Sequence, residues 1–417
     1  MITSSTSHLI APVVALAIAC GFVGCGGDPA ESDTAAAVDA AVDASVDTGC
    51  TLPGSSFAAG TTIGNDDFSY LINGIGGTFT VNGAFYTPTT CNKITPCPLI
   101  VVVGDRDSSP YPNWKVGAQR LAEATESVVA VWNLPGTGIG GLKSGGIDDF
   151  GGDTAAIAVK EVMYRLSKNS HVDPKRAGYV TVGFGLVPTA SALAKFSLSS
   201  LSFVAFLIDV EGPSDRCAIS QAPENAALSI GPNDGPGVSE SACKFSAEAS
   251  HAKAYPVGAD GVPTSIVCAP GAWPITETGK NCTDEIWWAG REPARQLSAN
   301  AIQLRYQRIA FEIDHRMPSR HATTNMIKAL AASRSPWFTV NDMPPCGQPL
   351  SDADCAGLTS SCQRCWLAYS FGNGLSPAPY AKAGSLSEIT PDELLGDVVP
   401  RFVRRIIDIA NNPNCGS

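Results

Sequence analysis

The pattern of apolar positions predicts a chain in which strands and helices alternate. Runs rich in apolar residues, typical of strands buried on both faces of a sheet, occur at 98–104, 128–132 and 203–210, and a further strand is expected at 176–182. Between these runs, apolar residues recur at helical spacing at 119–126, 153–166 and 188–196. The alternation predicts an α/β fold class, with a mostly parallel central sheet and helices on both faces.

Other segments extend this predicted sheet at both ends. Alternating apolar and polar residues at 68–71 and 78–86 predict an antiparallel pair at its start. Later segments at 308–314 and 336–340 predict its last strands, with helices at 287–295 and 321–333. The remaining stretches at 217–284 and 345–365 are rich in cysteine, glycine and proline, and we interpret them as disulfide-rich insertions in the α/β domain.

The segment 391–410 predicts a final amphipathic helix. Thr390 to Glu393 has the capping-box pattern, with Pro391 at the first helical position. We expect the apolar face to pack on the core and the helix to bend near Pro400, and we favour this over a helix on a membrane surface because the domain needs that face. The apolar residues at helical spacing are Leu394, Leu395, Val398, Val399, Phe402, Val403, Ile406 and Ile407.

The strand at 176–182 leads directly into a glycine turn and then a helix. Strand, turn and helix form the local arrangement in which the motif G-x-S-x-G presents a nucleophilic serine. In one alignment Thr181, Gly183 and Gly185 take the three motif positions, so Gly183 stands where the serine belongs. A register two residues later places Gly185 there instead. Neither register supplies Ser, Cys or Asp, so the sequence predicts the turn without its nucleophile.

Composition narrows the class of protein and its partners. The 417 residues are 44% hydrophobic and 16% charged, which is enough for a sizeable core, and the net charge of −11 argues against nucleic acid and anionic lipid surfaces as partners. Of the 14 cysteines, twelve remain when Cys20 and Cys25 near the N-terminus are set aside, so up to six disulfides are possible. The pairings we favour are Cys91/Cys97, Cys217/Cys243, Cys268/Cys282 and Cys50/Cys415.

The N-terminal segment predicts export. Residues 9–23 are apolar but too few to span a bilayer comfortably, and they end at Gly24-Cys25 in a pattern that resembles the lipobox of bacterial lipoproteins. We therefore expect a signal peptide at 1–24, a lipid anchor at Cys25 and an acidic, alanine-rich tether at 25–50, followed by the folded domain at 51–417. No Lys or Arg precedes the apolar run, Cys20 ends a weaker competing lipobox, and an ordinary secretory signal or a short anchor is the alternative.

The order of these elements resembles the α/β-hydrolase superfamily, near its dienelactone-hydrolase and prolyl-oligopeptidase-like branches. The resemblance covers roughly residues 78–340. It rests on the apolar strand 99–104, the loop Asn133-Leu134-Pro135-Gly136, the segment 172–176 before the central strand, the glycine turn, and Glu312-Ile313-Asp314-His315. Since one fold hosts many functions, the site residues decide what the chain does.

The resemblance implies a serine nucleophile, an acid and a histidine in that chain order. The acid position matches Asp314, the serine position is Gly183, and the histidine should follow the last strand, yet no histidine lies beyond His321. The family's usual His-Gly after the first buried core strand is Gly104-Asp105 here. The resemblance therefore implies a degenerate active site, with no catalytic residue assigned and with Gly183 and Asp314 as vestigial positions.

Clustered titratable residues supply weaker candidates. His315 and His321 beside Asp314 could serve as auxiliary groups, as a relocated base pair or as a metal cluster, and Asp209 and Glu211 end a neighbouring strand. No zinc-type spacing is present, so we predict no metal and no cofactor. The segment 148–153 has oxygen ligands for calcium, but we favour a loop in which Asp153 caps the following helix.

Two classes of function follow from the sequence. The first is an envelope-anchored protein with an α/β-hydrolase fold that lacks the catalytic Ser and His and binds an unknown small molecule or protein, or acts as a scaffold. Its membrane partner is reached through the lipid anchor at Cys25, facing the periplasm or the cell exterior. The alternative is an active esterase-like or peptidase-like serine hydrolase with an unlocated nucleophile, and a metal-dependent activity at Asp314 and His315 is a third, weaker option.

Overall fold

The computed structural model divides the chain into two compact units, Met1–Thr48 and Gly49–Ser417. It describes residues 63–215 (apart from 76 and 106–107), 289–298, 304–310 and 389–411, the short pieces 255–256, 263–264 and 346–347, and scattered positions from 322 to 341. The predicted signal peptide, Cys25 and the tether lie outside the described residues. The two predicted cysteine-rich insertions are described only at the short pieces.

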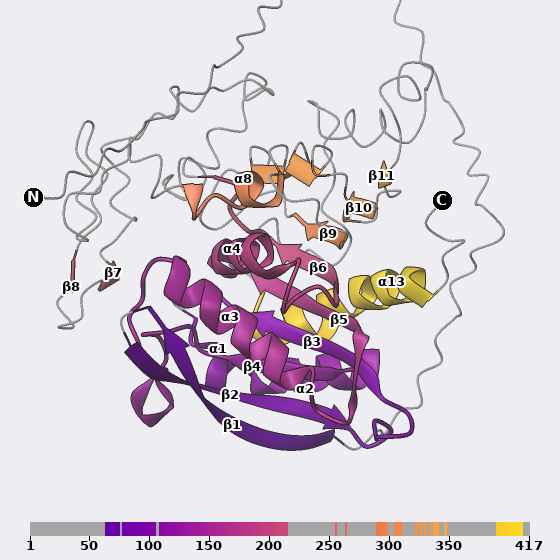
Figure 1. Ribbon diagram of the computed structural model, residues 1–417. Coiled ribbons are helices and arrows are strands. Elements are labelled where there is room, and N and C mark those ends of the chain that lie inside the picture. Colours follow the sequence, from indigo (N-terminus) through magenta and orange to yellow (C-terminus); the bar gives the residue numbers. More distant parts are fainter. Residues whose placement is uncertain are drawn as a thin grey trace, which may run out of the picture. The chain divides into compact units, whose positions relative to one another are not determined.

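The second unit is built on a nine-stranded sheet with the order β1-β2-β4-β3-β5-β6-β9-β10-β11 (Figure 1). Neighbouring strands from β4 to β10 are parallel, whereas β1, β2 and β11 join the sheet antiparallel. The mixed but mostly parallel sheet confirms the predicted α/β class. The strands are β1 (Ile63–Gly74), β2 (Gly77–Pro88), β3 (Cys97–Val103), β4 (Val128–Trp132), β5 (Val172–Val182), β6 (Val204–Val210), β9 (Arg305–Ile309), β10 (Trp337–Val340) and β11 (Cys346–Gly347), and β7 (Tyr255–Pro256) pairs with β8 (Pro263–Thr264) separately.

Helices cover both faces of the large sheet (Figure 1). Because side chains alternate along a strand, β3 sends Leu99 and Val101 into the core under α3 and α4, and Ile100 and Val102 into the core under α2 and α13. The helices are α1 (Pro110–Asn113), α2 (Lys115–Thr125), η1 (Gly140–Leu142), α3 (Asp153–Leu166), η2 (Gly183–Gly185), α4 (Leu186–Phe196), α8 (Pro293–Ser298), α12 (Pro391–Glu393), η5 (Leu394–Val398) and α13 (Val399–Asn411).

Two predicted elements are displaced along the chain. The strand expected at 308–314 is β9, which begins at Arg305 and ends at Ile309, because its buried Gln307 and Arg308 belong to the strand interior rather than to an exposed face. The helix expected at 287–295 is α8, which begins at Pro293. Proline at the start of α8 agrees with the preference of proline for the first helical turn.

The C-terminal helical segment packs as its apolar pattern predicts. Thr390 and Glu393 form the capping box, and the π-helical turn η5 precedes Pro400, where the missing N–H would interrupt an α-helix. The buried apolar side chains include Leu395, Phe402 and Ile406. No helix in the described part of the chain is long and apolar enough to cross a membrane.

This segment also holds both ends of α2. Asp392 Oδ1 accepts the N–H of Gly117, 275 residues earlier, at 2.7 Å. At the other end, the Arg404 guanidinium donates through Nε to the carbonyl of Ala124 at 2.7 Å, across 280 residues. The first N–H groups and the last carbonyls of a helix lack partners within the helix, so both contacts satisfy groups that α2 leaves open.

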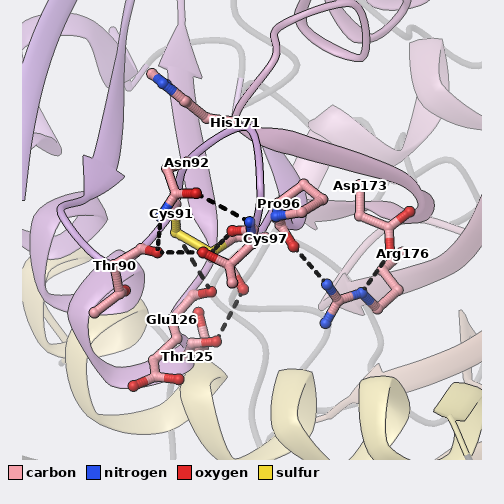
Figure 2. Close-up of a disulfide and its surroundings, with 12 residues drawn as sticks. Thr90, Cys91, Asn92, Pro96, Cys97, Thr125, Glu126, His171, Asp173 and Arg176 are labelled. Carbon is pink, nitrogen blue, oxygen red and sulfur yellow. Dashed lines mark hydrogen bonds and ion pairs between the residues drawn. A yellow bond between two sulfur atoms is a disulfide. The ribbon is translucent and has the colours of Figure 1, made fainter.

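A disulfide joins Cys91 and Cys97 on either side of the turn before β3 (Figure 2). It confirms that predicted pair; the other favoured pairs lie outside the described residues. Within the turn, Asn92 Oδ1 accepts the N–H groups of Ile94 and Thr95 at 2.8 and 3.0 Å. Arg176 Nη2 donates to the carbonyl of Pro96 at 2.7 Å, which ties the turn to β5.

Removing this disulfide should weaken the domain by a modest amount. The bridge closes a short loop, with a sequence separation of 6, and the chain-entropy relation gives about 2 kcal/mol for a loop of that length. We expect Cys91→Ala/Cys97→Ala to lower the free energy of unfolding by that amount in denaturant titrations. A loss below about 0.5 kcal/mol would mean that the hydrogen bonds of the turn hold it equally well without the bridge.

Candidate functional site

The turn after β5 has the geometry of a nucleophile elbow. β5 ends at Val182, Gly183 has φ of 53°, and the short helix η2 leads without a break into α4. A residue with a side chain is strained at this left-handed φ, whereas glycine adopts it freely. Gly183 therefore lets the backbone form the elbow without strain, and it places no side chain there.

Close packing at Gly185 decides between the two registers of the motif. A Cβ atom at Gly185 would lie 2.1 Å from the carbonyl oxygen of Val103 and 2.9 Å from that of Gly104. Both obstacles are backbone atoms that continue β3, so a nucleophile at position 185 would require β3 to move. At Gly183 the nearest atoms belong to one side chain, that of Asp105. Only the register with Gly183 at the serine position is sterically possible.

Asp105 is the residue whose side chain lies nearest to Gly183. Its carboxyl carbon and Oδ2 lie 3.1 and 3.2 Å from the place where a Cβ of Gly183 would be. Its Oδ1 accepts the backbone N–H of Phe184 at 3.3 Å. The residue follows β3 and is only 6% exposed. The carboxylate therefore lies against the turn and fills the space in front of it.

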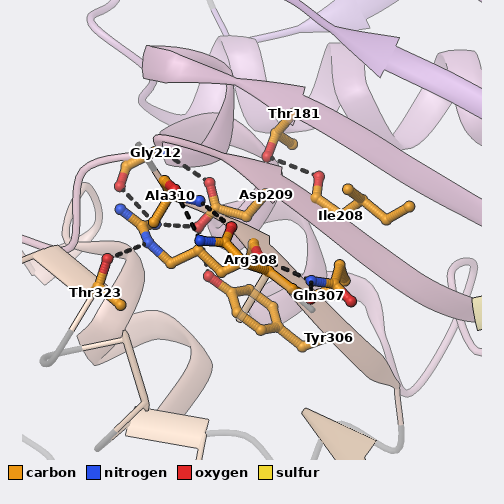
Figure 3. A network of polar contacts seen from close by, with 10 residues as sticks. Thr181, Ile208, Asp209, Gly212, Tyr306, Gln307, Arg308, Ala310 and Thr323 are labelled. Carbon is orange, nitrogen blue, oxygen red and sulfur yellow. Dashed lines mark hydrogen bonds and ion pairs between the residues drawn. The ribbon is translucent and has the colours of Figure 1, made fainter. Parts of the chain in front are cut away.

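A second cluster of charged and polar groups lies where β6 and β9 end (Figure 3). Arg308 and Asp209 form a fully buried ion pair through Nη1 and Oδ2. Tyr306 donates its hydroxyl to the same Oδ2, and the Gly212 N–H donates to Oδ1 at 2.7 Å. Arg308 also donates through Nε to the Thr323 hydroxyl at 2.8 Å, so five residues share one buried network.

The environment of this network fixes its charge states. Burial alone would lower the pKa of the Arg308 guanidinium, but the Asp209 carboxylate, with Tyr306 and Glu211, raises it above its ordinary value. Burial, reinforced by Asp209, raises the pKa of Tyr306 far above its ordinary value. The tyrosine therefore keeps its proton and the arginine its charge. Such a network positions β6 against β9.

The segment 148–153 is a helix-capping loop, as favoured over a calcium site. Asp149 accepts the N–H groups of Gly152 and Thr154 at 3.0 and 2.6 Å, and Arg291 donates to its carbonyl. Burial raises the pKa of the Asp149 carboxyl, opposed by the charge of Arg291 and by the donated N–H groups. The expectation that Asp153 caps the helix was wrong. Gly152 is the N-cap residue, and the carboxylate that accepts the first helix N–H groups belongs to Asp149, three residues before it. The described residues contain no group of three metal-binding side chains.

This loop packs directly on the elbow. The ring of Phe150 meets the ring of Phe184 edge-on, with centroids 4.9 Å apart. A Cβ at Gly151 would lie 2.6 Å from Val187 on α4. The loop after β4 and the elbow therefore support one another, and α3 begins where that contact ends.

The structure places some of the predicted site residues and leaves others outside the described part of the chain. Gly183 and Asp209 lie at the carboxyl ends of neighbouring parallel strands, β5 and β6. Asp314, His315 and His321 lie outside the described residues, so the vestigial acid and the auxiliary histidines stay predictions. Sequence reasoning missed the approach of Asp105 to Gly183, for which the only signal was the change from His-Gly to Gly104-Asp105.

Comparison with known proteins finds similarity among solved structures. No protein-family profile and no curated protein sequence matches the chain. Among solved structures, it is similar to an esterase of the archaeon Pyrobaculum calidifontis, at 12% identity over 84% of each chain with a TM-score of 0.46. It is also similar to esterase Est22, at 10% identity over 84% of this chain and 80% of that one with a TM-score of 0.47.

A third similar structure is a peptidase. Dipeptidyl peptidase 4 of Porphyromonas gingivalis matches 66% of this chain and 31% of its own length, at 13% identity and a TM-score of 0.40. In this chain an antiparallel hairpin joins a row of parallel strands, and an elbow lies between the central β5 and α4. The chain has an α/β-hydrolase fold.

Proposed function

We propose that this chain is a non-hydrolytic protein with an α/β-hydrolase fold that acts as a binding or scaffold protein. The observation that carries the proposal is the elbow, where Gly183 supplies no nucleophile and adopts its left-handed φ without strain. A lineage that no longer depends on hydrolysis would lose the nucleophile and gain stability at this position. The absence of any histidine after His321 in the sequence supports the same proposal, since the position after the last strand would supply no general base for a serine.

The alternative is an active serine hydrolase whose nucleophile lies elsewhere. Ser191 is the serine of α4 that follows the elbow, and it is fully buried in the helix. Among the described residues, its hydroxyl has no hydrogen-bond partner and therefore no general base. We favour the non-hydrolytic function because a nucleophile needs both access to the substrate and a base within hydrogen-bond reach.

Labelling with a fluorophosphonate probe tests this function directly. We expect the purified chain to show neither stoichiometric labelling nor turnover of a p-nitrophenyl ester. The Gly183→Ser variant should also stay inactive, because no histidine follows the last strand and the Asp105 carboxylate faces the new side chain. An authentic serine esterase under the same conditions is the positive control. Labelling of the unaltered chain would overturn the proposal and would locate the missing nucleophile by peptide mapping.

We further propose that the protein is anchored to a bacterial envelope through a lipid on Cys25. The support is the apolar segment at 9–23 and its lipobox-like ending at Gly24-Cys25. Metabolic labelling with a palmitate analogue should tag the full chain and not the Cys25→Ser variant. The labelled chain should fractionate with membranes. Unchanged labelling after that substitution would point to Cys20 or to a different modification.

A further inference from the structure

The N–H that follows the nucleophile position of an elbow has a defined role. In an elbow with a serine, this N–H helps to receive the negative charge that develops on the carbonyl oxygen of the substrate. Here the corresponding group is the N–H of Phe184, one residue after Gly183. It is already engaged, because Asp105 Oδ1 accepts it at 3.3 Å. An anion that belongs to the chain itself therefore lies where an anion of the substrate would lie.

The surrounding backbone holds this carboxylate in place. β3 and β5 are paired in parallel up to Val103 and Thr181, so the residues that follow each strand emerge side by side. The Ser108 N–H donates to the Asp105 carbonyl at 3.0 Å. Before Asp105, a Cβ at Gly104 would lie 2.2 Å from Pro110. Asp105 is therefore held by a backbone hydrogen bond and by the close packing before it, so it loses little conformational freedom when its carboxylate meets the elbow.

Electrostatics favour the same placement. The carboxylate lies at the N-terminal end of η2 and α4, where the backbone carries partial positive charge. With 6% of its surface exposed, Asp105 is shielded from water, so its hydrogen bond to the Phe184 N–H is stronger than it would be in solvent. A carboxylate in this position replaces the solvent or ligand that the open N–H groups of a helix terminus would otherwise attract.

We propose that the Asp105 carboxylate is a permanent internal occupant of the anion position of the elbow. It closes this position to carbonyl and carboxylate ligands, whether or not a nucleophile is present. The inference rests on the proposed non-hydrolytic function and deepens it, since a ligand of this protein would have to bind outside the old oxyanion position. It also predicts that the position becomes an acceptor for small carboxylates once the Asp105 side chain is removed.

Rescue by acetate tests this inference in the full chain. The Asp105→Ala variant should melt at a lower temperature than the unaltered chain, and sodium acetate should restore stability by occupying the vacated position. We expect the melting temperature of the variant to rise by about 2–4 °C in acetate relative to sodium chloride at equal ionic strength. The unaltered chain should show no such difference between the two salts.

Matched variants separate a specific site from a general salt effect. Asp105→Asn keeps the volume of the side chain, so acetate should not raise its melting temperature. Asp173→Ala removes a partly exposed carboxylate that pairs with Arg176 at the start of β5, and it should be equally insensitive to acetate. If Asp105→Ala does not fold in chloride, its refolding yield in acetate and in chloride gives the same comparison.

Two results would overturn the inference. One is an acetate effect on Asp105→Ala no larger than on the unaltered chain, and the other is an equal effect on Asp105→Asn. Failure of the proposed function is a separate outcome. It would appear as fluorophosphonate labelling of the unaltered chain, and acetate rescue of Asp105→Ala does not depend on that result.

Discussion

Replacing Arg308 by methionine should lower the free energy of unfolding by about 3–5 kcal/mol. The Asp209 carboxylate is fully buried, and Arg308 is its ion-pair partner. Without that partner, the described part of the chain leaves Asp209 the Tyr306 hydroxyl and the Gly212 N–H. An uncompensated charge in the interior is far more costly than the loss of one contact. Chemical denaturation measures the effect.

The charge origin of this effect can be separated from loss of packing. Asp209→Asn combined with Arg308→Met removes both charges and keeps a hydrogen-bonding side chain on β6, so it should recover a large part of the loss. Arg120→Met is the matched control, because Arg120 and Asp397 form an ion pair in which both side chains are about half exposed. It should cost less than about 1 kcal/mol. Equal losses for the single and double variants would contradict the electrostatic explanation.

Gly185→Ala should destabilise the domain by about 3 kcal/mol, at the upper end of the range for an overfilled core. The new methyl group would lie 2.1 Å from the carbonyl oxygen of Val103 and 2.8 Å from its carbonyl carbon. A flexible side chain could turn aside, but these atoms belong to the backbone at the end of β3. The elbow would have to move away from the end of β3. Denaturant titration monitored by tryptophan fluorescence measures the loss.

Gly141→Ala provides the comparison for this change. A Cβ at Gly141 meets nothing within 4 Å, and the residue is exposed in η1. It should change the free energy of unfolding by no more than about 0.5 kcal/mol. A loss at Gly185 as small as that at Gly141 would mean that β3 yields easily, and position 185 would then again be open to a side chain.

Apolar runs were sufficient to predict the central strands. β4 begins and ends where its apolar run does, β6 begins one residue after its run, and β3 begins and ends one residue before its run. The agreement is this close because strands buried on both faces have almost no polar positions. The rule fails for β9, whose buried Gln307 and Arg308 find polar partners within the fold. A sequence alone cannot show that a polar residue has such a partner, so the predicted start of β9 was three residues too late and its predicted end five residues too late.

The candidate site also contains one feature that the sequence predicted and others that it could not. The elbow was predictable because its glycines stand at fixed spacing between a strand and a helix, a purely local signal. The approach of Asp105 to Phe184 joins residues 79 positions apart and depends on β3 lying beside β5. The capping of α3 by Asp149 was missed for a related reason, since the loop folds back before the helix begins.

The two contacts that hold the ends of α2 also limit how early this domain can finish folding. Asp392 and Arg404 lie 275 and 280 residues after the groups they bind. At a synthesis rate of 5–20 residues per second, α2 leaves the ribosome about 14–55 s before its partners exist. During that interval, the face of the sheet that Phe402 and Ile406 later cover stays exposed to water. Folding of this domain therefore needs residues 391–407 and can be completed only after most of the chain has been made.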